Sequence, residues 1–326
     1  MQLELRHLRT VCAIADAGSV SKAAAVLGLA QPALTAQLQR IEAALGGTLF
    51  DRDRRGARPT PLGELVLNRA RVLLPAVQEL QYDAIRLADN GSELQRFRIA
   101  AVSVPFLAGL VRRLEDAYPG ALVTTTVSWS AAELAELVSA RRGDFTIAGV
   151  CGDAPPPAVP GLAWTPIATG PVFVLLSAEH PCARLPEVRL EQLSDMRWAV
   201  TPGDGCFADC FAAACARAGF TPAGMYEVDT ASCLDLAQSG DAAALCQATM
   251  REAPGLVAVP IAGAPLSWRH LLGWLPRTAA AEFAEQVADL AGEAYAAVIA
   301  RNSRYPEWLA THPHFGAHRP HAPLPV

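Results

Sequence analysis

One stretch of the chain, residues 19–38, constrains the fold more than any other, because its residues fit two short helices joined by a tight turn. Ala24 is small where the two helices must lie close together, and Gly28 stands where the turn needs a positive φ. Leu34 and Leu38 recur at helical spacing, so both side chains should face a core. We interpret the stretch as a helix-turn-helix, whose second helix can enter the major groove of DNA.

The same spacing turns a second set of side chains outward. Pro32 falls in the first turn of the second helix, where a missing N–H costs little, and Leu27 should close the first helix on its inner side. The alternative is an ordinary helical hairpin inside a core. The outward side chains of the second helix are those of Gln31, Pro32, Thr35, Ala36 and Gln39.

The flanking sequence favours DNA binding. A helix opens at Leu5-Arg6-His7-Leu8, and Ile41-Glu42 and Leu45-Gly46 follow the motif. A short basic patch comes next and can meet phosphates; it consists of Arg52, Arg54, Arg55 and Arg58. With these features, residues 3–63 resemble the winged helix-turn-helix of LysR-type transcriptional regulators.

This resemblance implies roles for individual residues. Gln31, Pro32 and Thr35 stand at the groove-facing positions of that family, and Arg52 and Arg55 stand at its wing arginines.

Two positions depart from the family pattern. Ala30 occupies the cap of the recognition helix, which is often Ser or Thr, and the missing cap costs roughly 0.5–2 kcal/mol of helix stability. Ala36 stands where many members carry Arg, so a contact with a base or phosphate is in question there. The full set expected to contact DNA is Ser21, Lys22, Gln31, Pro32, Thr35, Ala36, Gln39, Arg52, Arg54, Arg55 and Arg58.

Composition limits the other classes of function. A formal net charge of −5 over 326 residues argues against a protein that coats nucleic acid nonspecifically. No apolar run reaches the ~20 residues of a membrane span, and the N-terminus lacks the apolar core of a signal peptide. We therefore expect a soluble, cytoplasmic protein. Eight cysteines without C-x-x-C spacing argue against a zinc finger, and no catalytic, cofactor-binding or metal-binding set is recognisable.

Residues 61–89 have the pattern of one long helix with an apolar stripe. Pro75 should break or kink this helix, and Asn90-Gly91-Ser92 should end it in a hinge. A helix leading away from a small DNA-binding unit cannot bury such a stripe alone. A partner helix in a dimer is the simple solution, and packing on its own domain is the alternative.

From residue 96 onward, strand and helix patterns alternate, which predicts a parallel sheet covered by helices. The order resembles the two-lobed, periplasmic-binding-protein-like effector domain of the same family, with crossings between the lobes near residues 164–167 and 262–268. The predicted fold class is α/β, with an N-terminal winged helix-turn-helix, a long linker helix and a two-lobed effector domain. The expected divisions are 1–61 (DNA binding), 62–90 (linker), 91–301 (effector domain; lobe I about 96–163 and 268–301, lobe II about 164–267) and a Pro/His-rich tail at 302–326.

Polar residues follow several strands at the ends where helices begin. Ligands of open α/β sheets bind beyond these ends, and helix N-termini favour an anion or a polar molecule. Ser130 and Glu133 have capping-box spacing, so the alternative is that such residues only cap helices. The expected effector-binding residues are Ser103, Ser128, Trp129, Ser130, Thr201, Pro202 and Thr230.

Cysteines offer a second kind of input. The spacing of Cys206 and Cys215 resembles that of the paired cysteines in peroxide-sensing members of the family, and a helix N-terminus lowers the pKa of a thiol. The Ala- and Phe-rich surroundings are instead typical of core cysteines. In the tail, proline density argues against helix, so we expect a loose segment rather than a metal site for its four histidines.

The sequence thus predicts a LysR-type, sequence-specific DNA-binding regulator, not an enzyme, controlled by a small polar or anionic effector between two lobes. Its expected partners are double-stranded DNA with an interrupted palindromic operator, the effector, and copies of itself in a homodimer or homotetramer; no membrane contact is expected. Two alternatives remain open: a redox-sensing regulator of the same family that uses Cys206 and Cys215, and a small-molecule-binding α/β protein or enzyme without DNA function.

Overall fold

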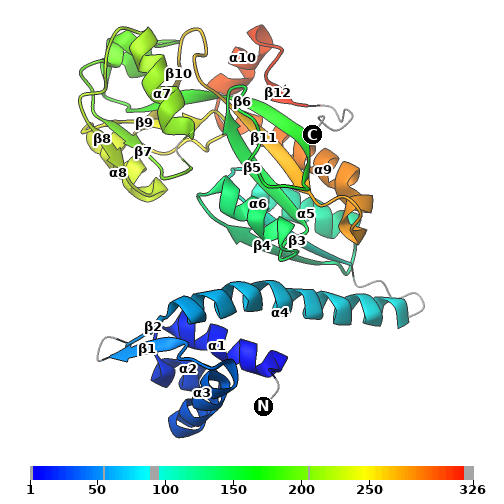
Figure 1. The fold of residues 1–326 in the computed structure, drawn as a ribbon. Coiled ribbons are helices and arrows are strands. Elements are labelled where there is room, and N and C mark those ends of the chain that lie inside the picture. Colours follow the sequence, from blue (N-terminus) through cyan, green and yellow to red (C-terminus); the bar gives the residue numbers. More distant parts are fainter. Residues whose placement is uncertain (1–2, 54–55, 89–94, 205, 319–326) are drawn as a thin grey trace. The chain divides into compact units, whose positions relative to one another are not determined.

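In the computed structural model, the described residues are 3–53, 56–88, 95–204 and 206–318. The chain divides into two compact units, residues 1–93 and 94–326, and each is described by itself (Figure 1). Arg54, Arg55, the expected hinge at residues 90–92 and the tail from residue 319 lie outside the described residues.

The N-terminal unit combines helices α1 (Leu5–Ala17), α2 (Val20–Val26) and α3 (Gln31–Leu45) with an antiparallel hairpin of β1 (Phe50–Asp53) and β2 (Gly56–Pro59). Leu34 and Leu38 are fully buried, as predicted, and Gly28 has a φ of +65° in the turn before α3. Leu27 is 36% exposed, so the expectation that it faces inward is wrong. The reason is local: α2 already ends at Val26, and Leu27 is its C-cap residue.

Helix α4 (Pro61–Ala88) is one continuous helix of 28 residues (Figure 1). It runs through Pro75, so the break expected there does not occur. The first turns of α4 bury Val66, Leu67 and Ala70 in the core of the N-terminal unit. Other apolar side chains of α4 remain exposed, namely Leu65, Val72, Leu73 and Leu80.

The C-terminal unit is built on strands in the order β4-β3-β5-β11-β6-β9-β7-β8, and β10 and β12 also pair with β6. The strands are β3 (Arg96–Ala101), β4 (Leu122–Val127), β5 (Phe145–Cys151), β6 (Ala163–Ser177), β7 (Trp198–Val200), β8 (Met225–Glu227), β9 (Ala243–Gln247), β10 (Leu256–Pro260), β11 (Ser267–Trp274) and β12 (Gly316–Ala317). The α-helices are α5 (Leu107–Ala117), α6 (Ala131–Ser139), α7 (Cys206–Arg217), α8 (Thr230–Ser239), α9 (Ala284–Ala296) and α10 (Arg304–Thr311). Parallel pairing of β3 with β4 and β5, and of β7 with β8 and β9, agrees with the predicted α/β class.

The long strand β6 belongs to two halves of this unit. Up to Pro171 it pairs with β11, and from Val172 onward it pairs with β9 and β10. We call the part around β3, β4, β5 and β11 lobe I, and the part around β7, β8, β9 and β10 lobe II. The first crossing therefore lies between Pro171 and Val172, later than the predicted residues 164–167, because β6 continues through those residues and changes its partner strands only after Pro171. The second crossing, between β10 and β11, falls within the predicted residues 262–268.

Residues 302–318 are part of the fold, so the expectation of a loose tail is wrong for them. Tyr305 of α10 is fully buried, and its hydroxyl lies 2.8 Å from that of Tyr295 on α9. Trp308 packs edge-on against Phe173 of β6, and β12 extends the sheet beside β6. Pro306 does not prevent a helix here because it lies in the first turn of α10, where the N–H has no intrahelical partner.

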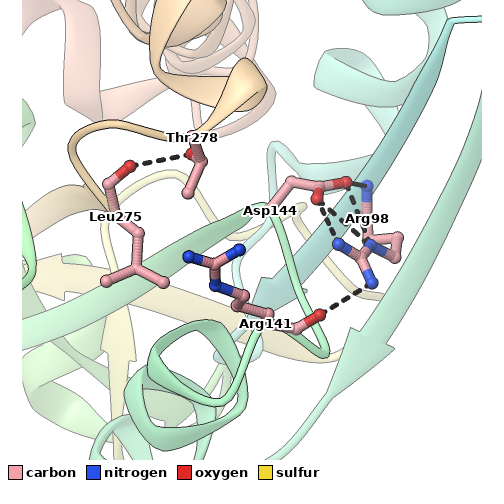
Figure 2. A network of polar contacts seen from close by, with 5 residues as sticks. All are labelled: Arg98, Arg141, Asp144, Leu275 and Thr278. Carbon is pink, nitrogen blue, oxygen red and sulfur yellow. Dashed lines mark hydrogen bonds and ion pairs between the residues drawn. The ribbon is translucent and has the colours of Figure 1, made fainter. Parts of the chain in front are cut away.

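An ion pair ties β3 to the start of β5 (Figure 2). Asp144 accepts hydrogen bonds from the guanidinium Nη2 of Arg98 at 2.5 Å and from the backbone N–H of Arg98 at 2.8 Å. Arg98 Nη1 also donates to the carbonyl oxygen of Arg141 at 2.9 Å, in the turn after α6. In the same view, Thr278 Oγ1 donates to the carbonyl oxygen of Leu275 at 2.8 Å. The pair thus fixes the turn that joins α6 to β5, and α6 borders the cavity described below.

Candidate functional site

The first candidate surface is the outer face of α3. Leu34 and Leu38 face the core, whereas other side chains of α3 stay at the surface. The structure leaves the predicted groove-facing set accessible: Gln31, Pro32, Ala36 and Gln39 are exposed and Thr35 is half-buried.

The N-terminal ends of α2 and α3 differ in their capping. Ser19 caps α2, since its Oγ accepts a hydrogen bond from the backbone N–H of Lys22 at 3.1 Å. Ser21 and Lys22 stay exposed beside it. Ala30 takes the N-cap position of α3 with no side-chain cap, as predicted from the sequence. The first N–H groups of α3 are therefore not used by a capping side chain, and such groups bind phosphates well.

The wing is the β1–β2 hairpin. Gly56 has a φ of +132°, and a Cβ atom there would lie 2.4 Å from the carbonyl oxygen of Gly18, so only glycine fits. The same carbonyl accepts the N–H of Ala57 at 2.8 Å, which anchors the wing to the end of α1. Arg58 is exposed on β2, and Arg52 lies on β1 with its side chain outside the described atoms.

The second candidate site is a cavity of about 160 Å³ between lobe I and lobe II. Four of the seven predicted effector-binding residues line it, namely Ser103, Trp129, Thr201 and Pro202. Ser103 and Trp129 come from lobe I, and Thr201 and Pro202 follow β7 of lobe II. Strand ends of both lobes therefore meet at one place, as the parallel topology requires.

The structure does not place Ser128, Ser130 or Thr230 in the lining. Ser130 caps α6, because its Oγ accepts the backbone N–H of Glu133 at 3.0 Å. Ser128 Oγ donates to Glu133 Oε2 at 2.5 Å. Thr230 is the exposed first residue of α8. Ser130 thus has the capping role that the sequence left open as the alternative.

Several lining residues were not among those predicted from the sequence. They are two carboxylates, Asp204 and Glu227, two aromatic side chains, Phe207 and Trp268, and the amide of Gln247. Sequence signals existed for some of them: Asp204 follows Thr201 in one loop, and Glu227 ends β8. Gln247 Oε1 and Trp268 Nε1 are buried and have no hydrogen-bond partner in the described structure. Both atoms lie in the wall of the cavity with almost no accessible surface of their own.

Asp204 connects the two lobes. Its Oδ2 accepts a hydrogen bond from the backbone N–H of Ala132, the second residue of α6, at 2.9 Å. At α8, Asp229 has the equivalent capping role and accepts the backbone N–H of Ser232 at 2.9 Å. That hydrogen bond from the backbone of Ser232 lowers the pKa of the Asp229 carboxyl. Both helix N-termini thus already hold a carboxylate of the chain itself.

The cysteine pair lies on one helix. Cys206 begins α7 and Cys215 lies nine residues later in the same helix, which corresponds to roughly 14 Å along its axis. A disulfide needs Cα atoms within about 4.4–6.8 Å, so the pair can join only if α7 unfolds. Cys215 is fully buried, and burial raises the pKa of its thiol to about 11. The side chain of Cys206 lies outside the described atoms.

The histidines of the last segment have structural contacts. His312 stacks on Trp308 with ring centroids 3.8 Å apart, and His318 Nε2 lies 2.7 Å from Thr169 Oγ1. Within the described ranges, no group of three or more His, Cys, Asp or Glu side chains could hold a metal ion.

The helices of the described part of the chain are all too short or too polar to cross a lipid bilayer.

Two family models match the chain. The model described as "Bacterial regulatory helix-turn-helix protein, lysR family" matches residues 5–64. The model described as "LysR substrate binding domain" matches residues 90–296. The two matches correspond to the two units of the structure.

Known proteins are similar over nearly the whole length. The "Small neutral protease regulatory protein" of Streptomyces coelicolor is 37% identical over 318 residues, which cover 95% of this chain and 92% of that protein. The protein of the same name from Streptomyces lividans is 37% identical over 318 residues, which cover 95% of this chain and 87% of that protein.

Solved structures share the fold. The crystal structure of CbnR, a LysR family transcriptional regulator, has a TM-score of 0.70 at 24% identity and covers 89% of this chain and 99% of that chain. Full-length CbnR complexed with its target DNA has a TM-score of 0.69 at 23% identity and covers 90% of this chain and 100% of that chain.

Proposed function

Because the chain belongs to the LysR family of transcriptional regulators, we propose that it binds a specific DNA operator through α3 and the wing and responds to a small polar effector in the interlobe cavity. Family membership makes it a regulator and not an enzyme. One observation carries the DNA-binding proposal: α3 buries Leu34 and Leu38 and leaves the polar side chains of Gln31 and Gln39, with Pro32, exposed to solvent. This separation puts polar side chains within reach of base edges in a major groove.

The wing supports the same role. The basic patch of Arg52, Arg54, Arg55 and Arg58 follows α3 closely in the sequence, and Arg58 is exposed on β2. Arginines beside a recognition helix neutralise phosphates or enter the minor groove, which positions the helix without reading sequence.

Dimer formation through α4 completes the proposal. The apolar side chains Leu65, Val72, Leu73 and Leu80 recur along α4 and are exposed. A second α4 would cover them, and two recognition helices would then read two half-sites of an interrupted palindrome. A homodimer or homotetramer satisfies this geometry.

A small-molecule signal is better supported than a redox signal. The cavity lies between the lobes, so a ligand that contacts both favours one arrangement of the lobes over another. Three observations argue against a redox signal. Cys215 is buried, the pKa of its thiol is raised, and it lies far from Cys206 along one helix. A small-molecule-binding protein without DNA function would not need the exposed face of α3 or the basic wing.

A gel-shift titration tests the DNA-binding proposal. The DNA is the region upstream of the chain's own gene; the name of the Streptomyces relatives suggests the region upstream of a small neutral protease gene as a second probe. Gln31→Ala should reduce the preference for the operator over unrelated DNA on the order of tenfold. Arg58→Ala should weaken binding to both and lower the salt slope by about 1.

The control for this titration is Arg184→Ala, which removes an exposed arginine of lobe II. It should bind both DNAs as the unchanged protein does. Equal affinity of the unchanged protein for operator and unrelated DNA would contradict sequence-specific binding.

A further inference from the structure

The interlobe cavity carries negative charge and no positive charge. Asp204 and Glu227 line it, and the described lining contains no Lys, Arg or His. Gly205 and Cys206, which follow Asp204 in the sequence, are not basic either. A cleft lined by charges of one sign concentrates the electric field, so this cavity attracts cations and repels anions.

Two helix N-termini that could bind an anion are already occupied by carboxylates of the chain. The N-terminus of α6 is held by Asp204, and the N-terminus of α8 is held by Asp229. An anionic ligand would have to displace a carboxylate that belongs to the same chain and so has a high effective concentration. The N-termini of α6 and α8 therefore do not favour an anion in this protein, although free helix N-termini do.

Aromatic rings surround the same space. Trp129, Phe207 and Trp268 line the cavity, and the rings of Phe207 and Trp268 meet edge to face with centroids 5.4 Å apart. Tryptophan faces are the best partners for cation–π contacts. A volume of about 160 Å³ suits one benzene-sized body, since roughly 150 Å³ accommodates benzene.

From these four observations we infer that the effector is a small organic cation, with a ring-sized apolar body among Trp129, Phe207 and Trp268 and a protonated amine facing Glu227 and Asp204. This inference rests on the proposed role of the cavity as the effector site. It narrows the expectation from the sequence, which allowed a polar or an anionic ligand, to the cationic class.

Three probes of nearly equal size and different charge test the inference: benzylammonium, benzyl alcohol and benzoate. Their binding to the full-length protein is measured by isothermal titration calorimetry at neutral pH and constant ionic strength. Benzylammonium should bind on the order of tenfold tighter than benzyl alcohol, because it gains a charge-assisted hydrogen bond. Benzoate should bind most weakly. Quenching of tryptophan fluorescence gives a second readout, because two of the six tryptophans line the cavity.

Three variants locate the binding. Glu227→Gln should lower the affinity for benzylammonium on the order of tenfold and leave the affinity for benzyl alcohol unchanged. Asp204→Asn should do the same, since an asparagine oxygen can still accept the N–H of Ala132. Glu187→Gln removes an exposed carboxylate outside the cavity and should bind all three probes as the unchanged protein does.

Several results would overturn the inference. They are benzoate binding as tightly as benzylammonium, absence of benzylammonium binding, or an equal loss of affinity in Glu187→Gln. The calorimetric measurements are made without DNA, so a negative result for ligand binding does not contradict the proposed DNA binding. A protein that binds its operator but not benzylammonium contradicts only the ligand class, and one that binds benzylammonium but no DNA contradicts only the regulator.

Discussion

The Asp204 carboxylate accepts a hydrogen bond from the backbone N–H of Ala132 at 2.9 Å and so joins the two lobes across the cavity. The two residues lie 72 positions apart, one in the loop before α7 and the other in the first turn of α6. A carboxylate at a helix N-terminus is favourable both as a hydrogen-bond acceptor and as a charge beside the helix dipole. The contact therefore favours a closed arrangement of the lobes.

Asp204→Ala should loosen this closure. The Ala132 amide loses its acceptor, so its hydrogen exchange should speed up on the order of five- to tenfold, since a hydrogen bond of this kind contributes about 1 kcal/mol. Exchange measured by NMR or mass spectrometry checks the result at α6. Asp195→Ala, which removes an exposed carboxylate elsewhere on lobe II, serves as the control. Equal exchange at Ala132 in both variants would show that the contact contributes nothing in solution.

Paired substitutions on α4 should dissociate the dimer. Leu73 and Leu80 are 49% and 67% exposed, and two glutamates in their place would put like charges in the expected seam. Light scattering at about 10 µM protein, a concentration that populates an interface of micromolar affinity, should shift from dimer or tetramer toward monomer. Gln81→Glu adds charge outside the exposed stripe and should leave the mass unchanged. An unchanged mass in Leu73→Glu/Leu80→Glu would place the interface elsewhere.

Ala30→Ser should stabilise α3. Ala30 has the extended backbone of an N-cap residue, with φ −68° and ψ 135°, but no side chain to accept a hydrogen bond. A serine there should add about 0.5–2 kcal/mol, seen as slower amide exchange in the first turn of α3. Ala36→Ser, on an exposed interior position of the same helix, should instead cost about 0.5 kcal/mol. A destabilised Ala30→Ser would mean that the serine hydroxyl cannot reach the helix N–H groups.

His270 should make the protein less stable in mild acid. Its ring is buried between Phe106 and Tyr295, and this burial lowers its pKa from 6.5 to about 3. Between pH 6.5 and 3 the unfolded chain binds a proton that the folded chain does not, so stability falls as pH falls. The loss from this residue should be about 2 kcal/mol between pH 7.5 and pH 5.

Urea unfolding at these two pH values measures that loss. His270→Gln removes the titrating group and should reduce the difference between the two stabilities by this amount. His314→Gln changes an exposed histidine and should retain the full difference. A difference that His270→Gln leaves unchanged would assign the acid sensitivity to other groups.

Peroxide should not control DNA binding. At neutral pH the buried Cys215 thiol stays protonated because its pKa is raised to about 11, and a protonated thiol is a poor nucleophile. Operator affinity should be the same before and after peroxide in the unchanged protein and in Cys206→Ser. Peptide mass spectrometry should find Cys215 unmodified in the folded protein. A peroxide response that disappears in Cys206→Ser or Cys215→Ser would restore the redox alternative.

The sequence alone determined the features that depend on neighbours along the chain. The helix-turn-helix could be predicted because helical spacing places Leu34 and Leu38 on one side and because a turn at positive φ selects Gly28. The missing cap at Ala30 was expected from the resemblance to the family, in which the residue before the recognition helix is often Ser or Thr. Alternation of strand and helix patterns predicted the α/β class, since strands and helices have different hydrophobic periods in the sequence.

Only the tertiary structure decided which residues form the cavity and what closes it. Asp204 meets Ala132, and Glu227 comes to line the same cavity as Trp129, through the packing of two lobes rather than through any local pattern. The path of β6 through both lobes and the packing of Tyr305 on Tyr295 also depend on partners far along the chain. From the sequence, Ser130 could either cap a helix or contact a ligand. In the structure its Oγ accepts a hydrogen bond from the Glu133 N–H, so it caps α6. The sequence could not predict these contacts because hydrophobic periodicity shows only which side of an element is buried. Which group a side chain then contacts depends on the packing of segments that are distant in the sequence.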